Sequence, residues 1–355
     1  SNQSFQEELT DNYVNFLPNN YRDIEGETGE ITNIFRLNNN LFVHTKEALW
    51  QLPRNYQERV TDQIVSFIGT GSYFEIPPQK LVDDETGLSA GTTHKWASIK
   101  TPVGYFFVSA NQGKIYQLGG EGGLKPISNI GMSKWFNENI TNIDNNPSNP
   151  NSTGYVSVYD SHNERVIFTK LDKVKSWTIS FSLLSNKWVS FHSYKPNIYL
   201  QSPNKFYSWK NINRKEENKI WEHNIKGSYQ TFYGNLKPHI VEYISVNSPV
   251  VTKVWDYFQI NTQAQKFVND VFVDDLHTTF NKGIFYNSRQ CSGELTFITK
   301  DVELYDENYM ESQIKNYDEN HIIIDRTERD WFVNDFRDIR IDYSAPIWKE
   351  NFTEI

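Results

Sequence analysis

Residue types that carry chemistry are present in this chain, but their spacing forms no recognised catalytic or cofactor motif. Asp270, Asp274, Asp275 and His277 lie close together in the sequence (DVFVDDLH) and could hold a cation. Carboxylates that alternate beside a β-strand are more often a solvated face, so we expect no metal there. The eight histidines show neither HxH nor HExxH spacing. We predict no metal and no cofactor.

The nucleotide and nucleophile motifs are incomplete. Gly69–Ser72 (GTGS) lacks a third glycine, and Gly119–Gly123 (GGEGG) lacks the Lys-Ser/Thr of a phosphate loop, so we predict turns at both. Cys291 has no histidine in a recognisable partner context, and no GxSxG motif occurs. Sugar-cleaving enzymes need a carboxylate pair or a tyrosine nucleophile, and no pair stands out here. We predict that the chain is not an enzyme, and we name no catalytic residue.

Composition narrows the class of protein. The chain has 355 residues, 15% aromatic residues and a net charge of -9, and alanine is rare, which favours strands over helices. The acidic charge disfavours tight nucleic-acid binding. The single cysteine rules out an internal disulfide and a cysteine-based zinc site. No apolar run is long enough to span a membrane. The start without Met is expected for an expression scar, a processed product or an excised fragment.

Five segments share an alternating apolar strand, a polar turn and an aromatic second strand. Hairpins are predicted at Phe42–Leu52, Phe106–Leu118, Tyr155–Lys170, Trp177–Phe191 and Ile198–Trp209. Period-2 alternation puts one set of side chains of each hairpin on a buried face. The pattern predicts an all-β, β-propeller-like array of antiparallel hairpin blades, incomplete or with inserted loops, plus a C-terminal extension. A β-sandwich or an open meander of similar hairpins is the alternative.

Three segments interrupt this pattern. Met132–Ile140 is predicted to be a short helix, Asn139–Ser152 a polar surface loop and internal boundary, and Asn211–Asn218 a charged hairpin tip. The predicted parts are an N-terminal β region (1–140), a main propeller-like region (141–300) and an acidic and aromatic extension (301–355).

Aromatic residues at alternating strand positions are expected in the core. Trp188 and Phe191 are predicted to be buried on one hairpin face, and His192 beside them is predicted to be a hydrogen-bonded strand residue. Trp50 and Trp209, like Trp188, could stack on sugars, but a place in the blade core is the favoured interpretation.

Several phrases, taken in order, are similar to one family of phage tail proteins. They are Ile127–Phe136 (ISNIGMSKWF), Tyr155–Thr169 (YVSVYDSHNERVIFT), Lys187–Tyr199 (KWVSFHSYKPNIY), Ile220–Gly234 (IWEHNIKGSYQTFYG), Phe280–Glu294 (FNKGIFYNSRQCSGE) and Arg326–Asp338 (RTERDWFVNDFRD). The chain resembles, from Gly69 to its end, the β-propeller nozzle or muzzle proteins of crAss-like short-tailed bacteriophages, also called tail stabilization proteins.

The resemblance implies a structural virion protein at the distal end of the tail, made in the host cytoplasm. Its partners would be other tail proteins and copies of itself in a hexameric ring around the ejection channel. Family members are much longer than this chain, which agrees with a processed or excised fragment. DNA would be passing cargo only, because an acidic lumen repels phosphate.

A second hypothesis comes from a different class of protein. Trp135, Tyr207 and Trp209 could lie in loops that contact sugar, which would make the chain a host-surface carbohydrate-binding module. A glycan hydrolase of the same fold is a weaker version of this hypothesis.

Overall fold

The computed structural model divides into two compact units, Ser1–Lys237 and Pro238–Ile355, and each is described by itself. Strands dominate both units, and one α-helix occurs among the described residues. The three-part division of the chain stays a prediction. The structure describes residues 14, 21–24, 26–38, 40–53, 57–61, 64–68, 75–119, 123–143, 154–210, 219–244, 257–275, 278–286, 291–299, 321–327 and 330–333.

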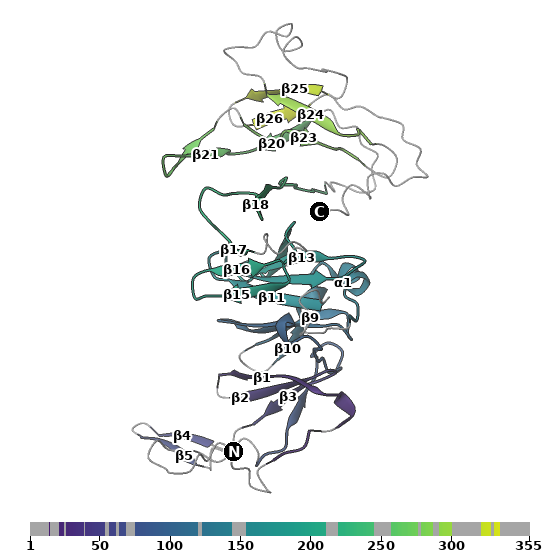
Figure 1. Cartoon of the computed structure of the whole chain (residues 1–355), viewed down its shortest axis with the longest axis vertical. Helices are drawn as coiled ribbons and strands as arrows, with labels where there is room; N and C mark the ends of the chain where they lie inside the picture. The colour runs from purple at the N-terminus through teal and green to yellow at the C-terminus, as the bar shows by residue number, and fades with distance from the viewer. Residues whose placement is uncertain are drawn as a thin grey trace. The chain divides into compact units, whose positions relative to one another are not determined.

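The first unit begins with three antiparallel four-stranded sheets that follow one another along the chain (Figure 1). The first sheet has the order β1-β2-β3-β6, and hairpin β4-β5 lies between β3 and β6 in the sequence. The second and third sheets, β10-β9-β8-β7 and β11-β12-β13-β14, are simple meanders. The strands are β1 (Ile31–Leu37), β2 (Asn40–Thr45), β3 (Leu49–Leu52), β4 (Gln57–Thr61), β5 (Ile64–Ile68), β6 (Gln79–Leu81), β7 (Ser98–Thr101), β8 (Gly104–Ser109), β9 (Lys114–Leu118), β10 (Leu124–Pro126), β11 (Gly154–Asp160), β12 (Arg165–Leu171), β13 (Trp177–Ser182) and β14 (Lys187–Phe191).

A fourth sheet and a short hairpin complete the first unit. The fourth sheet has the order β15-β16-β17, and the hairpin pairs β18 with β19. Their strands are β15 (Ile198–Gln201), β16 (Phe206–Trp209), β17 (Ile220–Glu222), β18 (Thr231–Phe232) and β19 (Asn235–Leu236). The helices of this unit are the 3-10 helices η2 (Gly26–Thr28), η3 (Lys95–Ala97) and η4 (Ile127–Asn129) and the α-helix α1 (Ser133–Asn139).

Strands β8, β11 and β12 of the second and third sheets are buried on both faces. In β8, Tyr105 and Phe107 belong to one apolar core and Phe106 and Val108 to another, because successive side chains of a strand point to opposite faces. The prediction of one buried face per hairpin is therefore wrong for hairpins β8-β9 and β11-β12. Each of these two hairpins has an apolar core on both sides.

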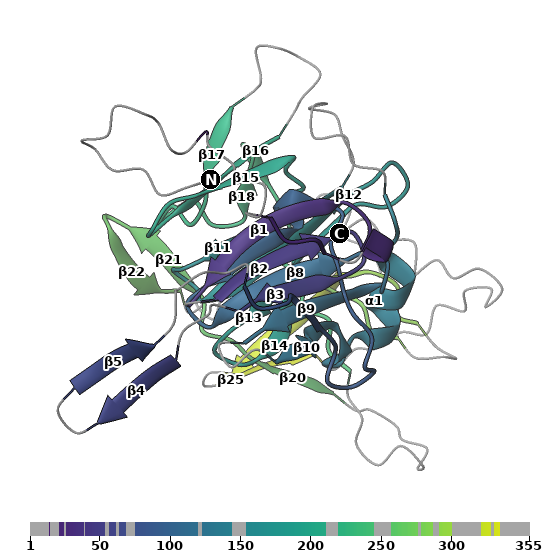
Figure 2. The same cartoon turned by 90° about the horizontal axis from the view of Figure 1, so that it is seen from below.

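Three apolar cores separate the four sheets. The first core joins Phe42 of β2 to Tyr116 of β9, and the second joins Phe106 of β8 to Phe181 of β13. The third joins β11 and β12 to Phe206 of β16. The first three sheets form successive layers in Figure 1 and lie over one another in Figure 2, where the fourth sheet lies beside them. Sheet-on-sheet packing of aromatic and β-branched residues thus holds this unit together.

The predicted helix at Met132–Ile140 is confirmed as α1, and it closes one side of the second core. Phe136 is fully buried there. The Trp135 ring makes edge contacts with Trp177 at 5.3 Å and with Phe191 at 5.1 Å between ring centroids. A two-turn helix is not stable alone, so these aromatic contacts account for its formation.

Trp188 and Phe191 lie on the α1 side of β14, but neither is fully buried. Trp188 is half-buried, packs at 4.6 Å from the Phe136 ring and donates its indole N–H to Ile127 O at 3.1 Å. Phe191 is 44% exposed, so its predicted burial is wrong. The reason is that β14 is the edge strand of its sheet and α1 covers only part of it.

All five predicted hairpins are confirmed as antiparallel pairs: β2-β3, β8-β9, β11-β12, β13-β14 and β15-β16. The glycine-rich stretch at 119–123 joins β9 to β10, with the Gly119 N–H donating to Gly123 O at 3.1 Å. The all-β class is confirmed as several small, mostly antiparallel sheets. Among the described residues these sheets do not close into a barrel, and a propeller-like arrangement stays a prediction.

The second unit contains one larger sheet and one separate hairpin. The sheet has the order β20-β26-β25-β24-β23 and includes one parallel pair, β24-β25, which the antiparallel prediction did not anticipate. Its core contains Phe297 and Trp331. The strands of this unit are β20 (Phe258–Asn261), β21 (Gln265–Val268), β22 (Val271–Asp274), β23 (Lys282–Gly283), β24 (Leu295–Thr299), β25 (His321–Thr327) and β26 (Asp330–Val333), with β21 and β22 forming the hairpin.

The predicted polar loop begins later than Asn139. Asn139 is the last residue of α1 and is buried, and its carbonyl oxygen accepts hydrogen bonds from Lys170 Nζ at 3.0 Å and Trp177 Nε1 at 3.2 Å. Residues 144–152 of that loop lie outside the described residues. The same holds for the hairpin tip Asn211–Asn218, the turn at 69–72 and most of the extension at 301–355.

Candidate functional site

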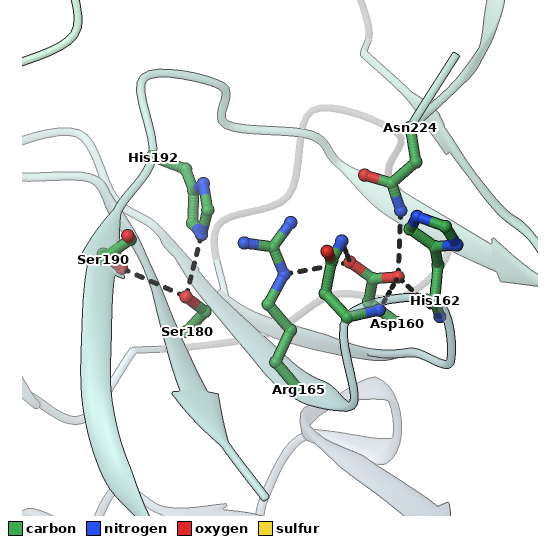
Figure 3. Close-up of polar contacts among 8 residues, drawn as sticks. Asp160, His162, Arg165, Ser180, Ser190, His192 and Asn224 are labelled. Carbon is green, nitrogen blue, oxygen red and sulfur yellow. Dashed lines mark hydrogen bonds and ion pairs between the residues drawn. The ribbon is translucent and has the colours of Figure 1, made fainter. Parts of the chain in front are cut away.

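Asp160 is a buried carboxylate whose hairpin turn supplies most of its hydrogen-bond donors (Figure 3). Asp160 ends β11 and Arg165 begins β12. The His162 backbone N–H donates to Oδ1 at 3.2 Å, and Asn163 Nδ2 donates to Oδ2 at 2.8 Å. Arg165 Nε donates to Oδ2 at 2.9 Å. An aspartate that accepts from the backbone two residues later forms an Asx turn, which fixes this loop locally.

A further donor reaches Asp160 from the fourth sheet. Asn224 follows β17 with a φ of 61°, and its Nδ2 donates to Asp160 Oδ1 at 2.9 Å. The neighbouring Ser161 hydroxyl donates to Pro203 O, in the β15-β16 turn, at 3.2 Å. These two contacts attach the β11-β12 turn of the third sheet to the fourth sheet.

The donors keep Asp160 ionised. Burial by itself would raise the pKa of the Asp160 carboxyl, but the hydrogen bond from Asn163 and the charge of Arg165 outweigh burial, and the pKa lies below its ordinary value. Hydrogen bonds to the charged form of a carboxylate favour that form. Both carboxylate oxygens already accept hydrogen bonds, so Asp160 has little capacity left to take a proton or bind a cation. Its role is to link the β11-β12 turn to the fourth sheet.

Arg165 lies between Asp160 and the imidazole of His192 (Figure 3). His192 Nε2 is 3.0 Å from Ser180 Oγ, which donates its own proton to Ser190 O at 3.4 Å, so Nε2 carries the imidazole proton. Burial, with the charge of Arg165, lowers the pKa of His192 to about 3. The predicted hydrogen bond of His192 is confirmed, although the residue follows β14 instead of lying within it. With a pKa this low, the His192 imidazole is a very weak base and stays unprotonated near pH 7.

Ser208 and His223 have the spacing of a nucleophile and its base. Ser208 Oγ on β16 lies 2.6 Å from His223 Nε2, just after β17, and 2.9 Å from Tyr233 Oη. Nucleophilic catalysis also requires that substrate reach the hydroxyl, and Ser208 is fully buried. Burial lowers the pKa of His223 to about 4. We interpret the pair as a hydrogen bond that fixes β17 and the following loop to β16.

His94, which precedes the second sheet, is hydrogen-bonded to the third sheet and to the segment before it. Its Nδ1 accepts the Tyr155 backbone N–H at 2.9 Å, so Nε2 carries the proton and donates to Ile143 O at 2.9 Å. Burial lowers the pKa of His94 to about 4, which agrees with this neutral tautomer. The buried polar groups at Asp160, Ser208 and His94 therefore all connect strands or sheets to one another.

Two carboxylates of the predicted acidic cluster, Asp274 and Asp275, pair with side chains of the neighbouring strand β21. Asp274 accepts from Gln265 Nε2 at 2.8 Å, and Asp275 pairs with Lys266 at 3.6 Å. His277 lies outside the described residues. Among the described residues, no group of three or more His, Cys, Asp or Glu side chains is placed to hold a metal ion.

The aromatic residues considered for sugar binding have different positions. Trp50 is buried in the first sheet, as the core interpretation expected, and Trp135 packs against the second core. Tyr207 and Trp209 are half-buried on the same face of the fourth sheet, on strand β16 and not in loops. Cys291 is half-buried, and its Sγ accepts the Gly293 N–H at 3.4 Å.

Sequence reasoning missed the Asp160 cross-link. The segment from Asp160 to Arg165 (DSHNER) carries a turn signal, because aspartate and asparagine favour Asx turns, and the hairpin itself was predicted. Asn224 lies 64 residues further along the chain, and no local pattern connects it to that turn.

The fold and these sites define a protein of small packed β-sheets that are joined by buried polar groups. The sequence profile of the Crassvirus muzzle proteins matches residues 1–212, more than half of the chain, and the chain belongs to this family. This match starts nearer the N-terminus than the resemblance seen in the sequence. The family is structural and not enzymatic.

A curated relative supports the same family. The chain is similar to the muzzle protein of Bacteroides phage crAss001, with 24% identity over 238 residues. The matched region covers 66% of this chain but 16% of that protein, so the chain spans only a small part of its relative's length. In the described residues, the helices are all too short or too polar to cross a membrane.

Proposed function

We propose that this chain is a wall segment of the distal nozzle in a phage tail, where copies of it form a ring around the channel for DNA and ejected proteins. The observation that carries the proposal is the family match over residues 1–212, the region that contains the first three sheets and the first two strands of the fourth. Stacked sheets with apolar cores and polar cross-links suit a rigid wall. In this proposal the protein is made in the host cytoplasm and resides in the virion.

The proposal includes a propeller-like order of the sheets and a hexameric ring with other tail proteins as neighbours. DNA passes as cargo: the chain has a net charge of -9, and an acidic lumen repels phosphate instead of binding it. The division into parts 1–140, 141–300 and 301–355 belongs to this proposal, in which the hairpin blades form the wall and the acidic extension makes contacts between copies.

The composition of purified phage particles tests this function. Quantitative mass spectrometry should find peptides of this chain at a fixed ratio to the portal protein, because a ring has a defined copy number. If the peptides are absent from particles, or vary in amount between preparations, the tail function is wrong.

Carbohydrate binding is the second candidate, and one observation favours it. Tyr207 and Trp209 lie on the same face of the fourth sheet, and an aromatic face of this kind can stack on a sugar ring. A glycan array with the purified protein tests it: reproducible binding that Trp209→Ala abolishes would support this candidate, and no binding would remove it.

A further inference from the structure

The joint between the third and fourth sheets of the first unit combines apolar and polar contacts. Its apolar part is the third core, which contains Val158 of β11 and Phe206 of β16. Its polar part includes the hydrogen bond from Asn224 to Asp160 (Figure 3). Both parts must break before the fourth sheet can separate from the third.

His223 lies at the edge of the third core and directly precedes Asn224 in the sequence. Its ring stacks on the Phe206 ring at 4.5 Å and lies 4.8 Å from the Tyr194 ring, measured between centroids. Phe206 and Tyr194 both belong to the third core. His223 is 9% exposed, so the closed joint shields its imidazole from water.

The ionisable groups that face His223 leave a positive charge there without a partner. These groups are Asp160, Arg165, His192, Tyr194 and Tyr233. Asp160 and Arg165 form an ion pair, so their charges offset each other. Burial raises the pKa values of Tyr194 and Tyr233, so both hydroxyls are neutral. A proton on His223 would therefore add an uncompensated charge to a site with little water.

Opening the joint changes how readily His223 takes up a proton. In the closed joint burial lowers the pKa of His223 to about 4, whereas its ordinary value in water is 6.5. Between these two values the open form binds a proton that the closed form does not, so a falling pH favours opening. Asp160 does not counteract this trend, because its ordinary pKa of 3.8 is lowered further in the closed joint and both forms stay ionised at pH 5.

We infer that this joint is a pH-sensitive device within the chain: the fourth sheet stays packed on the third at neutral pH and separates more readily in mildly acidic solution, because the closed joint has no place for a charged His223. Separation exposes Phe206 and Val158, so acid uncovers an apolar surface that neutral pH hides. The joint belongs to one chain and does not depend on the proposed ring.

The size of the effect follows from the two pKa values of His223. One histidine with these values makes opening about 20-fold more favourable at pH 5 than at pH 7. His192 adds to the change if the open form also exposes it, since burial lowers its pKa as well.

Hydrogen exchange followed by mass spectrometry measures the opening, because the amides of a sheet that loses its core exchange with solvent. Protection factors, corrected for the intrinsic exchange rate at each pH, are compared at pH 7 and pH 5. We expect protection in β15, β16 and β17 to fall about 20-fold or more. Protection in β12 is retained, because β12 stays paired with β11 and β13 when the joint opens.

Two variants assign the effect to His223. His223→Gln keeps a side chain that can hydrogen-bond to Ser208 but cannot be protonated, and we expect most of the pH dependence of the fourth sheet to disappear. His162→Gln is the matched control, because His162 lies in the β11-β12 turn of the same joint with an exposed side chain, and it should retain the full fall. Circular dichroism at pH 7 confirms folding, and His223→Phe replaces His223→Gln if the latter does not fold.

Four outcomes would overturn the inference. One is equal protection of the fourth sheet at pH 7 and pH 5 in the unmodified chain. Others are a fall that His223→Gln and His223→Phe both retain in full, or one that His162→Gln removes. A fall of the same size in β12 and in the fourth sheet would show that acid unfolds the whole first unit instead of opening this joint.

Discussion

Single buried ionisable residues decide how the sheets of the first unit are joined. Asp160 is charged and surrounded by donors, whereas His94, His192 and His223 are neutral and hydrogen-bonded. A buried charge is tolerated only when its partners remain in place. The chain therefore depends on a few polar side chains that have no role in chemistry with a substrate.

Asp160→Asn tests the cross-link between the third and fourth sheets. Removing one partner of a buried ion pair leaves Arg165 without its anion, and we expect a loss of about 3 kcal/mol in the free energy of unfolding, measured by urea titration. Glu164→Gln is the control, because Glu164 lies in the same turn and is exposed. Equal stability of the two variants would contradict the cross-link.

The same residue predicts a pH dependence. The pKa of Asp160 is lowered on folding, so its contribution is complete above its ordinary value of 3.8 and is lost as pH falls from there through the folded pKa. Unfolding titrations at acid pH should show a shallower loss of stability for Asp160→Asn than for the unmodified chain. A parallel loss in both proteins would mean that the carboxylate is not shifted.

His44 provides a second test at a single residue. It is fully buried against Phe35, Tyr105 and Phe107, and among the described residues neither ring nitrogen has a hydrogen-bond partner. Burial lowers its pKa to about 3, so protonation of the unfolded chain destabilises the fold as pH falls from 6.5 towards 3. His44→Phe should reduce this acid sensitivity, measured as unfolding free energy against pH.

His94→Phe is the matched control for His44→Phe. His94 uses both ring nitrogens in hydrogen bonds, so its replacement should lower stability at neutral pH by about 1–3 kcal/mol because the Tyr155 N–H and the Ile143 carbonyl lose their partner. If the two variants have the same free energy of unfolding at neutral pH, the hydrogen bonds of these imidazoles do not determine stability.

At the scale of elements, local patterns predicted the hairpins well and the surroundings of each hairpin poorly. The five hairpins follow from alternation and turn residues within about 15 residues of chain. The outer strands β7 (SIKT) and β10 (LKP) were missed because they are too short to show a period. Which face is buried depends on the next sheet, and no pattern within one strand contains that information.

Edge strand β14 gives a prediction at this scale. Trp188→Ala removes contacts with Phe136 and Phe181 and the hydrogen bond to Ile127 O, and we expect a loss approaching the ~3–5 kcal/mol typical of a buried tryptophan. Phe191→Ala on the same strand should cost clearly less, since Phe191 is partly exposed. Thermal unfolding of both variants checks the order, and a reversed order would contradict the packing of β14 against α1.

At the scale of the whole molecule, each unit has its own apolar core. In the first unit, three cores lie between the sheets and another, with Val43 and Trp50, lies on the other face of the first sheet; the core of the second unit contains Phe297 and Trp331. We expect a chain ending at Lys237 to fold by itself, because a compact unit with its own core is an independent domain. Cooperative unfolding of this shortened chain, followed by circular dichroism, checks the expectation; a broad, non-cooperative transition would contradict it.

The meander order of the second and third sheets has a consequence for synthesis. Every hydrogen-bonded neighbour in these sheets is also a neighbour in the sequence, so each sheet is complete once a short stretch of chain has left the ribosome. Local pairing of this kind closes only short loops and favours fast folding. Since domains fold as the chain emerges, each new sheet finds the preceding one already available to pack against. The order of translation is thus the order of stacking, which limits the time that any aromatic face spends in water.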